Sequence, residues 1–219
     1  MLKGERMAYF PALLNIENKK VVIVGGGKVA TQKVRSLLPA KAHIYIISPK
    51  LTEELVAYVK AGHVIWHEKM FEPPDVNEAV LIFAATDSKA VNEAVEAATS
   101  PWQHLSRVDA KGRNDFITPA VIRRGDLVLA ISTSGASPGY TKKLKKELET
   151  QFDDSYAQYI EFLKHCRTQI IHHVTEPTAK RYALKETLRP ELFDWLAKGD
   201  IARCEAFLQN LLDENRGHI

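Results

Sequence analysis

The pattern of hydrophobic and polar positions in the first half of the chain alternates between β-strands and α-helices. Short apolar runs rich in β-branched residues predict strands, and apolar residues spaced three and four positions apart predict helices. The predicted strands span 21–24, 43–48, 64–67, 81–86 and 105–109, and the predicted helices span 30–38, 52–61 and 89–98. This rhythm is typical of a Rossmann-like α/β fold with a mainly parallel sheet.

The pattern changes after residue 109. A polar loop at 111–114 precedes two predicted strands at 118–122 and 127–133, which a turn at 123–126 joins. Ser137 and Pro138 then predict the N-cap and first position of a basic helix that ends near Phe152. Further helices are predicted at 156–171, 178–188, 190–196 and 200–212.

These patterns predict three parts in the chain. Residues 1–113 form a nucleotide-binding Rossmann domain, 114–150 a small α+β segment, and 151–219 a C-terminal helical domain. A hydrophobic fraction of 45% is ample for a core in each of the larger parts.

A glycine-rich turn directly follows the first predicted strand. Gly25, Gly27 and Ala30 fall on the spacing G-x-G-x-x-A, and a helix pattern begins at once. The first glycine permits the tight turn, the second lets the backbone approach a pyrophosphate, and the small third residue lets the helix pack closely. This context favours a dinucleotide site over a plain structural turn.

The end of the second strand does not decide between NAD and NADP. An acidic residue about 20 positions beyond the glycines normally holds the ribose 2′-hydroxyl. This chain has Ser48 there, which would not repel a 2′-phosphate.

Composition and charge narrow the remaining classes. A net charge of +3 is too small to indicate a nucleic-acid partner, and the lysines of the basic helix are interspersed with glutamates. The sequence has no apolar run of about 18 residues and no signal segment, so we expect a cytoplasmic protein without a membrane anchor. Neither the eight histidines nor the two cysteines have metal-ligand spacing, and we expect no metal site.

Two further stretches carry candidate chemistry. Asp109 ends the fifth predicted strand, at the sheet edge where a dinucleotide would bind, and its carboxylate could accept a proton. The hydroxyl-rich loop 132–137 precedes a helix N-terminus, which suits a carboxylate or phosphate. A capping aspartate and an ordinary capped turn are the structural alternatives for these two features.

Several of these motifs, in this order, resemble the precorrin-2 dehydrogenase family, whose module also occurs fused to a methyltransferase in sirohaem synthases. The motifs are GGGKVATQK at 25–33, FAATD at 83–87, VD at 108–109 and DFITPAVIRRGDLVLAISTSGASP at 115–138. The resemblance implies an NAD-dependent oxidoreductase of sirohaem biosynthesis, which converts precorrin-2 to sirohydrochlorin. It also implies a homodimer that pairs through the hairpin at 118–133.

The resemblance implies roles for individual residues. Asp109 matches the functional aspartate, the expected general base. The expected cofactor-binding residues are Gly25, Gly27, Lys28, Val29, Ala30, Ser48, Pro49, Ala85, Thr86 and Asp87. The expected substrate-binding residues are Ser132, Thr133, Ser134 and Ser137. The family pattern has asparagine two or three residues before the aspartate, where this chain has Ser106 and Arg107.

Three alternatives remain open on sequence alone. Some relatives also insert iron or cobalt into sirohydrochlorin, and the sequence does not decide whether this chain does. A non-enzymatic NAD-sensing module would need neither Asp109 nor the hydroxyl loop. An NAD(P)-dependent reductase of another small acid would have a narrow substrate cleft.

Overall fold

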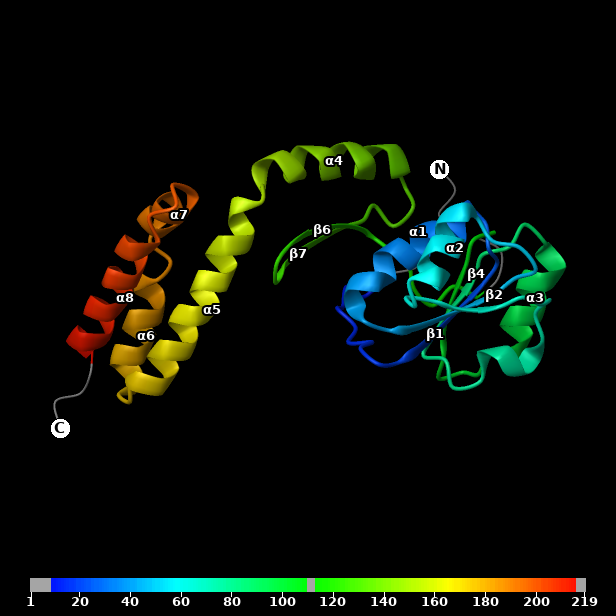
Figure 1. Cartoon of the computed structure of the whole chain (residues 1–219), viewed down its shortest axis with the longest axis horizontal. Coiled ribbons are helices and arrows are strands. Elements are labelled where there is room, and N and C mark those ends of the chain that lie inside the picture. Colours follow the sequence, from blue (N-terminus) through cyan, green and yellow to red (C-terminus); the bar gives the residue numbers. More distant parts are fainter. Residues whose placement is uncertain (1–8, 110–112, 216–219) are drawn as a thin grey trace, which may run out of the picture. The chain divides into compact units, whose positions relative to one another are not determined.

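The computed structural model describes residues 9–109 and 113–215 (Figure 1). The chain divides into two compact units, of which the first ends at Thr118 and the second begins at Pro119. The outer ends of the predicted domains and residues 110–112, with half of the predicted loop 111–114, lie outside the described residues. The further division at residue 150 into a dimerisation segment and a helical domain stays a prediction.

The first unit is built around a five-stranded parallel sheet, which confirms the predicted fold class. Its strands are β1 (Lys20–Val24), β2 (His43–Ile47), β3 (Ile65–His67), β4 (Leu81–Ala84) and β5 (His104–Arg107). Their order is β3-β2-β1-β4-β5, so the chain reverses direction across the sheet between β1 and β4. The central strand β1 is apolar at successive positions because both of its faces are covered.

Helices cover both faces of this sheet. On one face, α1 (Lys28–Leu37) and α2 (Glu53–Lys60) pack Val34 and Leu55 against Ile23 of β1. On the other face, α3 (Lys89–Ala98) packs Val95 against Ile82, beside the short 3-10 helix η2 (Pro73–Val76). A second 3-10 turn, η1 (Leu38–Ala40), extends α1. Alternate residues of each strand therefore supply two separate apolar layers.

The second unit begins with a hairpin and continues as helices. Strands β6 (Ala120–Arg124) and β7 (Leu127–Ile131) pair antiparallel and lead into α4 (Pro138–Gln151). The remaining helices are α5 (Ser155–His173), α6 (Pro177–Glu186), α7 (Pro190–Ala197) and α8 (Ile201–Asn215), drawn yellow to red in Figure 1. Phe162, Cys166, Leu192 and Leu208 belong to their shared core.

Several predicted strand ends differ from the observed ones. Strand β6 begins two residues later than predicted and includes both arginines of the expected turn, because the hairpin closes over only Gly125 and Asp126. Gly125 has φ +57°, which suits a tight hairpin turn. Strand β5 ends at Arg107, so Asp109 lies in the turn after the strand.

Candidate functional site

The glycine turn after β1 is fixed by its neighbours in the sheet. Gly25 has φ +120°, and a Cβ added there would lie 2.4 Å from the carbonyl oxygen of Ala85, which follows β4. Its amide donates to the carbonyl of Ile47 at 2.9 Å. Only glycine fits this left-handed and crowded position, which agrees with the tight turn predicted from sequence.

The turn also requires glycine at position 26, which is the variable position of the G-x-G motif. A Cβ on Gly26 would lie 2.0 Å from the carbonyl oxygen of Lys50 and 2.8 Å from the hydroxyl of Ser48. The amide of Thr52 also donates to the Gly26 carbonyl at 3.0 Å. The loop between β2 and α2 thus packs directly on the glycine turn, and the uninterrupted run of three glycines was the available sequence signal.

Gly27 differs from the other two glycines because it faces open space. A Cβ there would meet no atom within 4 Å, and the residue is the N-cap of α1. The first amides of a helix have no partners within the helix, and its N-terminus favours negative charge. The bare backbone in front of α1 therefore fits the pyrophosphate of a dinucleotide. Ala30 is fully buried beneath this turn, as its predicted role in close packing requires.

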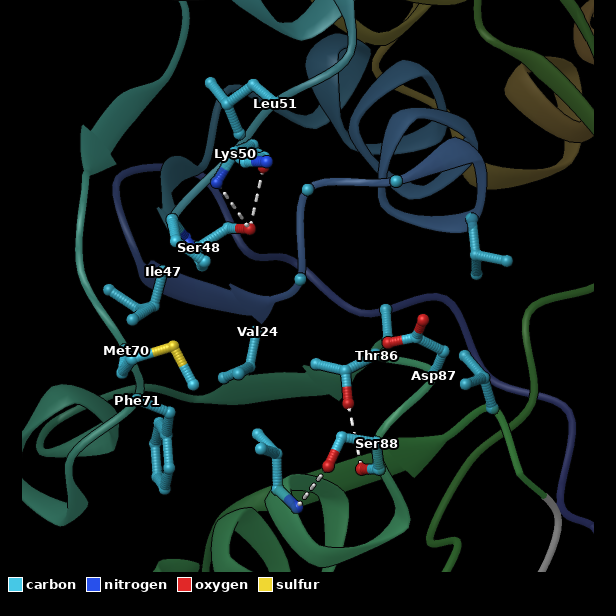
Figure 2. A pocket seen from close by; sticks show the side chains of 18 of the residues that line it. Val24, Ile47, Ser48, Lys50, Leu51, Met70, Phe71, Thr86, Asp87 and Ser88 are labelled. Atoms are coloured by element: carbon cyan, nitrogen blue, oxygen red, sulfur yellow. Dashed lines mark hydrogen bonds between the residues drawn. The ribbon is translucent and has the colours of Figure 1, made fainter.

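A cavity of about 900 Å³ opens at this edge of the sheet. Figure 2 shows Ser48, Lys50 and Leu51 on one side of it and Thr86, Asp87 and Ser88 on the other. All predicted cofactor-binding residues except Ala30 line the cavity. Lining residues that the sequence argument missed are Val24, Gly26, Ile47, Lys50, Leu51, Thr52, Lys69, Met70, Phe71, Ser88, Val91 and Val108.

The side chain of Ser48 closes the turn after β2. Its hydroxyl donates to the carbonyl of Lys50 at 2.8 Å, as Figure 2 shows, and its own carbonyl accepts from the Trp66 indole at 2.8 Å. Ser48 is 7% exposed. The Ser48 hydroxyl therefore shapes the turn after β2 at the edge of the cavity.

Asn92 of α3 holds the opposite side of the cavity and was missed by the sequence argument. Its side-chain oxygen accepts from the Thr86 hydroxyl at 2.8 Å, and its amide donates to the Thr86 carbonyl at 3.1 Å. Asn92 is 1% exposed, so these bonds satisfy a buried amide. The one sequence signal that could have pointed to Asn92 is its position four residues after Ser88, which is the N-cap of α3.

Asp109 lies one residue beyond the cavity lining. The amide of Val108, which lines the cavity, donates to the carbonyl of Ala84 at 3.1 Å, so this turn continues along the edge of β4. Both carboxylate oxygens of Asp109 accept from Arg107, at 3.0 Å from Nε and 2.7 Å from Nη2. The Arg107 guanidinium lowers the pKa of the Asp109 carboxyl, and the Asn92 amide acts in the same direction against partial burial.

The hydroxyl-rich loop belongs to the second unit and is described by itself. The Thr133 hydroxyl accepts from the Ser137 amide at 3.0 Å, and the Ser132 hydroxyl accepts from the Ser134 amide at 3.0 Å. The Ser137 hydroxyl accepts from the amide of Tyr140 at 3.3 Å and caps α4, as predicted. These bonds shape the loop, and its role toward a substrate stays a prediction.

Membrane-spanning helices and metal-binding clusters are both absent from the described residues. Within residues 9–109 and 113–215, none of the helices has both the length and the apolar composition of a membrane span. Over the same ranges, no group of three or more His, Cys, Asp or Glu side chains is arranged to hold a metal ion.

Two family models match the chain. The first, described as "Putative NAD(P)-binding", covers residues 12–120, and the second, "Sirohaem biosynthesis protein central", covers residues 124–151. Together they cover most of the first unit and the beginning of the second, up to residue 151.

Curated relatives and solved structures are similar over most of the chain. "Precorrin-2 dehydrogenase" of Priestia megaterium is 30% identical over 202 residues, which cover 92% of this chain and 98% of that protein. "Siroheme synthase" of Nitrosospira multiformis is 31% identical over 212 residues, which cover 94% of this chain but 45% of that protein. The chain thus spans about half the length of the siroheme synthases it matches. The solved structure of "SirC, precorrin-2 dehydrogenase" has a TM-score of 0.78 at 30% identity and covers 93% of this chain and 98% of its own.

Proposed function

Because the chain belongs to the family of precorrin-2 dehydrogenases and the corresponding part of the siroheme synthases, we propose that it oxidises precorrin-2 to sirohydrochlorin with NAD. The observation that carries the proposal is the cavity at the carboxyl edge of the sheet, beside the reversal between β1 and β4. Dinucleotides bind at this point in open α/β sheets.

The residues around the cavity have distinct roles in this proposal. The backbone at Gly27 and the first amides of α1 bind the pyrophosphate, since a bare glycine leaves room there. Thr86 and Asp87, on the opposite side of the cavity from Ser48, face the nicotinamide half. NAD supplies the chemistry of the oxidation by accepting the hydride that precorrin-2 loses.

Asp109 is the proposed acceptor of the proton that precorrin-2 loses in the same reaction. What supports this is its position next to Val108 in the cavity wall and its ionised carboxylate. A carboxylate within reach of the carbon that loses its proton acts as a general base. The hydroxyl loop from Ser132 to Ser137 is proposed to bind carboxylates of the substrate, which has eight.

The proposed assembly is a homodimer in the cytoplasm that pairs through the hairpin of β6 and β7. The argument is the family resemblance together with the short two-stranded sheet, since an isolated two-stranded sheet leaves two edges to be covered. Sedimentation velocity of the full chain measures the assembly directly.

A spectroscopic assay tests the proposed activity. Purified protein with NAD and precorrin-2 is expected to produce the absorption spectrum of sirohydrochlorin, and Asp109→Asn is expected to lose most turnover while its NAD affinity, measured by calorimetry, stays within about twofold. Glu54→Gln, at an exposed ion pair with Arg35, is the control carboxylate variant.

Two outcomes contradict parts of the proposal. No spectral change with wild-type protein, where a known dehydrogenase works, defeats the activity, and normal NAD binding in that case favours a sensor. Full turnover of Asp109→Asn removes Asp109 from the proton transfer. Adding ferrous or cobalt ions to the product tests separately for metal insertion by the same protein.

A further inference from the structure

Arg107 occupies a position where the family pattern led us to look for asparagine, and its side chain is almost completely enclosed. The side chain is 4% exposed, and its guanidinium lies between two carboxylates, those of Glu96 and Asp109. Nε and Nη2 form a two-bond fork with Asp109, and Nη1 pairs with Glu96 of α3. A buried cation of this kind is stable only when its partners are well placed.

Glu96 fixes the chain on both sides of Asp109. One of its carboxylate oxygens pairs with Arg107, two residues before Asp109, and the other accepts from the backbone amide of Arg113 at 3.0 Å, four residues after it. Arg113 is in turn paired with Asp115, whose carboxylate accepts from the amide of Leu105 at 2.9 Å. Arg107 and Arg113, on either side of Asp109 in the sequence, are therefore both bound to Glu96.

From this geometry we propose that Arg107 is a positioning residue, which holds the Asp109 carboxylate in one orientation beside the cofactor cavity. The inference rests on the proposed function and deepens it, because it assigns the orientation of the proton acceptor to a residue that does not touch the substrate. A planar fork fixes both the position and the rotation of a carboxylate, which a single hydrogen bond or a lysine does not.

The electrostatics of the cluster support the same assignment. Among the described residues, the charged groups that face the Asp109 carboxylate are Arg107 from β5 and, across that guanidinium, Glu96 from α3, while Arg113 is engaged with Asp115. Arg107 lowers the pKa of Asp109, and the Arg113 amide and Arg107 together lower the pKa of Glu96. Without the guanidinium, the two carboxylates would repel each other and the pKa of Asp109 would rise.

The first experiment measures the carboxyl directly and needs no turnover. The full chain is labelled with 13C at aspartate side chains, and the Asp109 signal is assigned by its loss in Asp109→Asn. We expect it to titrate below about pH 3.9, the ordinary aspartate value, in wild type. In Arg107→Gln we expect its titration about 1 to 3 pH units higher. Arg35→Gln, which removes another guanidinium–carboxylate pair of the first unit, should leave it unchanged.

The second experiment is the pH profile of kcat with NAD and precorrin-2. In Arg107→Gln, the acidic limb of this profile is expected to move to higher pH by the same shift as the Asp109 titration. The KM for NAD is expected to stay within about twofold. Arg107→Lys keeps the charge but not the fork. Its acidic limb is therefore expected to stay low while kcat falls on the order of tenfold, through lost orientation.

The inference is overturned if the Asp109 carboxyl titrates at the same pH in wild type and in Arg107→Gln. It is also overturned if the kcat of Arg107→Lys equals that of wild type. If wild-type protein binds NAD but never oxidises precorrin-2, the proposed function has failed, and the carboxyl titration still decides whether Arg107 controls Asp109. If Arg107→Gln does not fold, Arg107→Lys decides the matter through kcat and its pH profile.

Discussion

Two adjacent glycines provide the sharpest test of how the turn after β1 serves the cavity. Gly27→Ala adds a Cβ to open space in front of α1, whereas Gly26→Ala adds one 2.0 Å from the Lys50 carbonyl oxygen. The same chemical change is thus made one residue apart. We expect the first to weaken NAD binding with little effect on the fold, and the second to destabilise the fold.

The expected magnitudes follow from these surroundings. Gly27 has φ −88° and ψ −167°, which alanine adopts without strain. In Gly27→Ala, the reduced freedom of the unfolded chain stabilises the folded protein by about 0.4–1 kcal/mol. The poorer N-cap of α1 lowers its stability by about 1 kcal/mol. The net change in unfolding free energy is therefore within about 1 kcal/mol. Gly26→Ala forces the loop between β2 and α2 away from the glycine turn, which lowers the unfolding free energy by roughly 1–3 kcal/mol.

We expect the affinity for NAD to fall more in Gly27→Ala than in Gly26→Ala, the reverse of their order in stability loss. A methyl group at Gly27 keeps the pyrophosphate from the amides of α1, and a hydrogen bond to a charged group contributes about 1.5–3 kcal/mol. That loss corresponds to an NAD dissociation constant raised roughly 10- to 150-fold.

Thermal unfolding by circular dichroism and NAD titration by calorimetry measure both quantities on the same samples. Wild-type NAD affinity in Gly27→Ala would show that the pyrophosphate does not approach this backbone. Equal loss of melting temperature in the two variants would show that Gly27 is needed by the fold and not by a ligand.

Two other predictions concern the second unit. Ser137→Ala removes the hydroxyl that accepts from the Tyr140 amide and is expected to lower the unfolding free energy by about 1 kcal/mol, measured by urea denaturation; an unchanged midpoint would contradict the cap. Burial raises the pKa of the Cys166 thiol to about 12, so its contribution to stability is complete below the unfolded pKa of about 8.5 and is lost as the pH rises toward 12. Urea midpoints between pH 7 and 11 are therefore expected to fall less steeply in Cys166→Ala, and the native thiol is expected to resist alkylation at pH 8.

The order of elements was predictable because it depends on short-range patterns. The run Val21–Val24 has no polar position, and β1 is indeed covered on both faces. Ser137 caps α4 as its position before a helical pattern predicted. Strand ends were less predictable, because Arg123 and Arg124 pair across a hairpin whose two-residue turn only the pairing register reveals.

The sequence by itself determined the glycine turn and the alternation of strands and helices, because both depend on residues that are close together along the chain, whereas the end of the fifth strand before Asp109 was not predicted. Only the tertiary structure decided that Gly26 touches the loop at Lys50 and that Arg107 lies between Asp109 and Glu96. Glu96 lies 11 positions from Arg107, and Lys50 lies 24 positions from Gly26. Side-chain burial and direction, which a linear pattern does not encode, select these contacts.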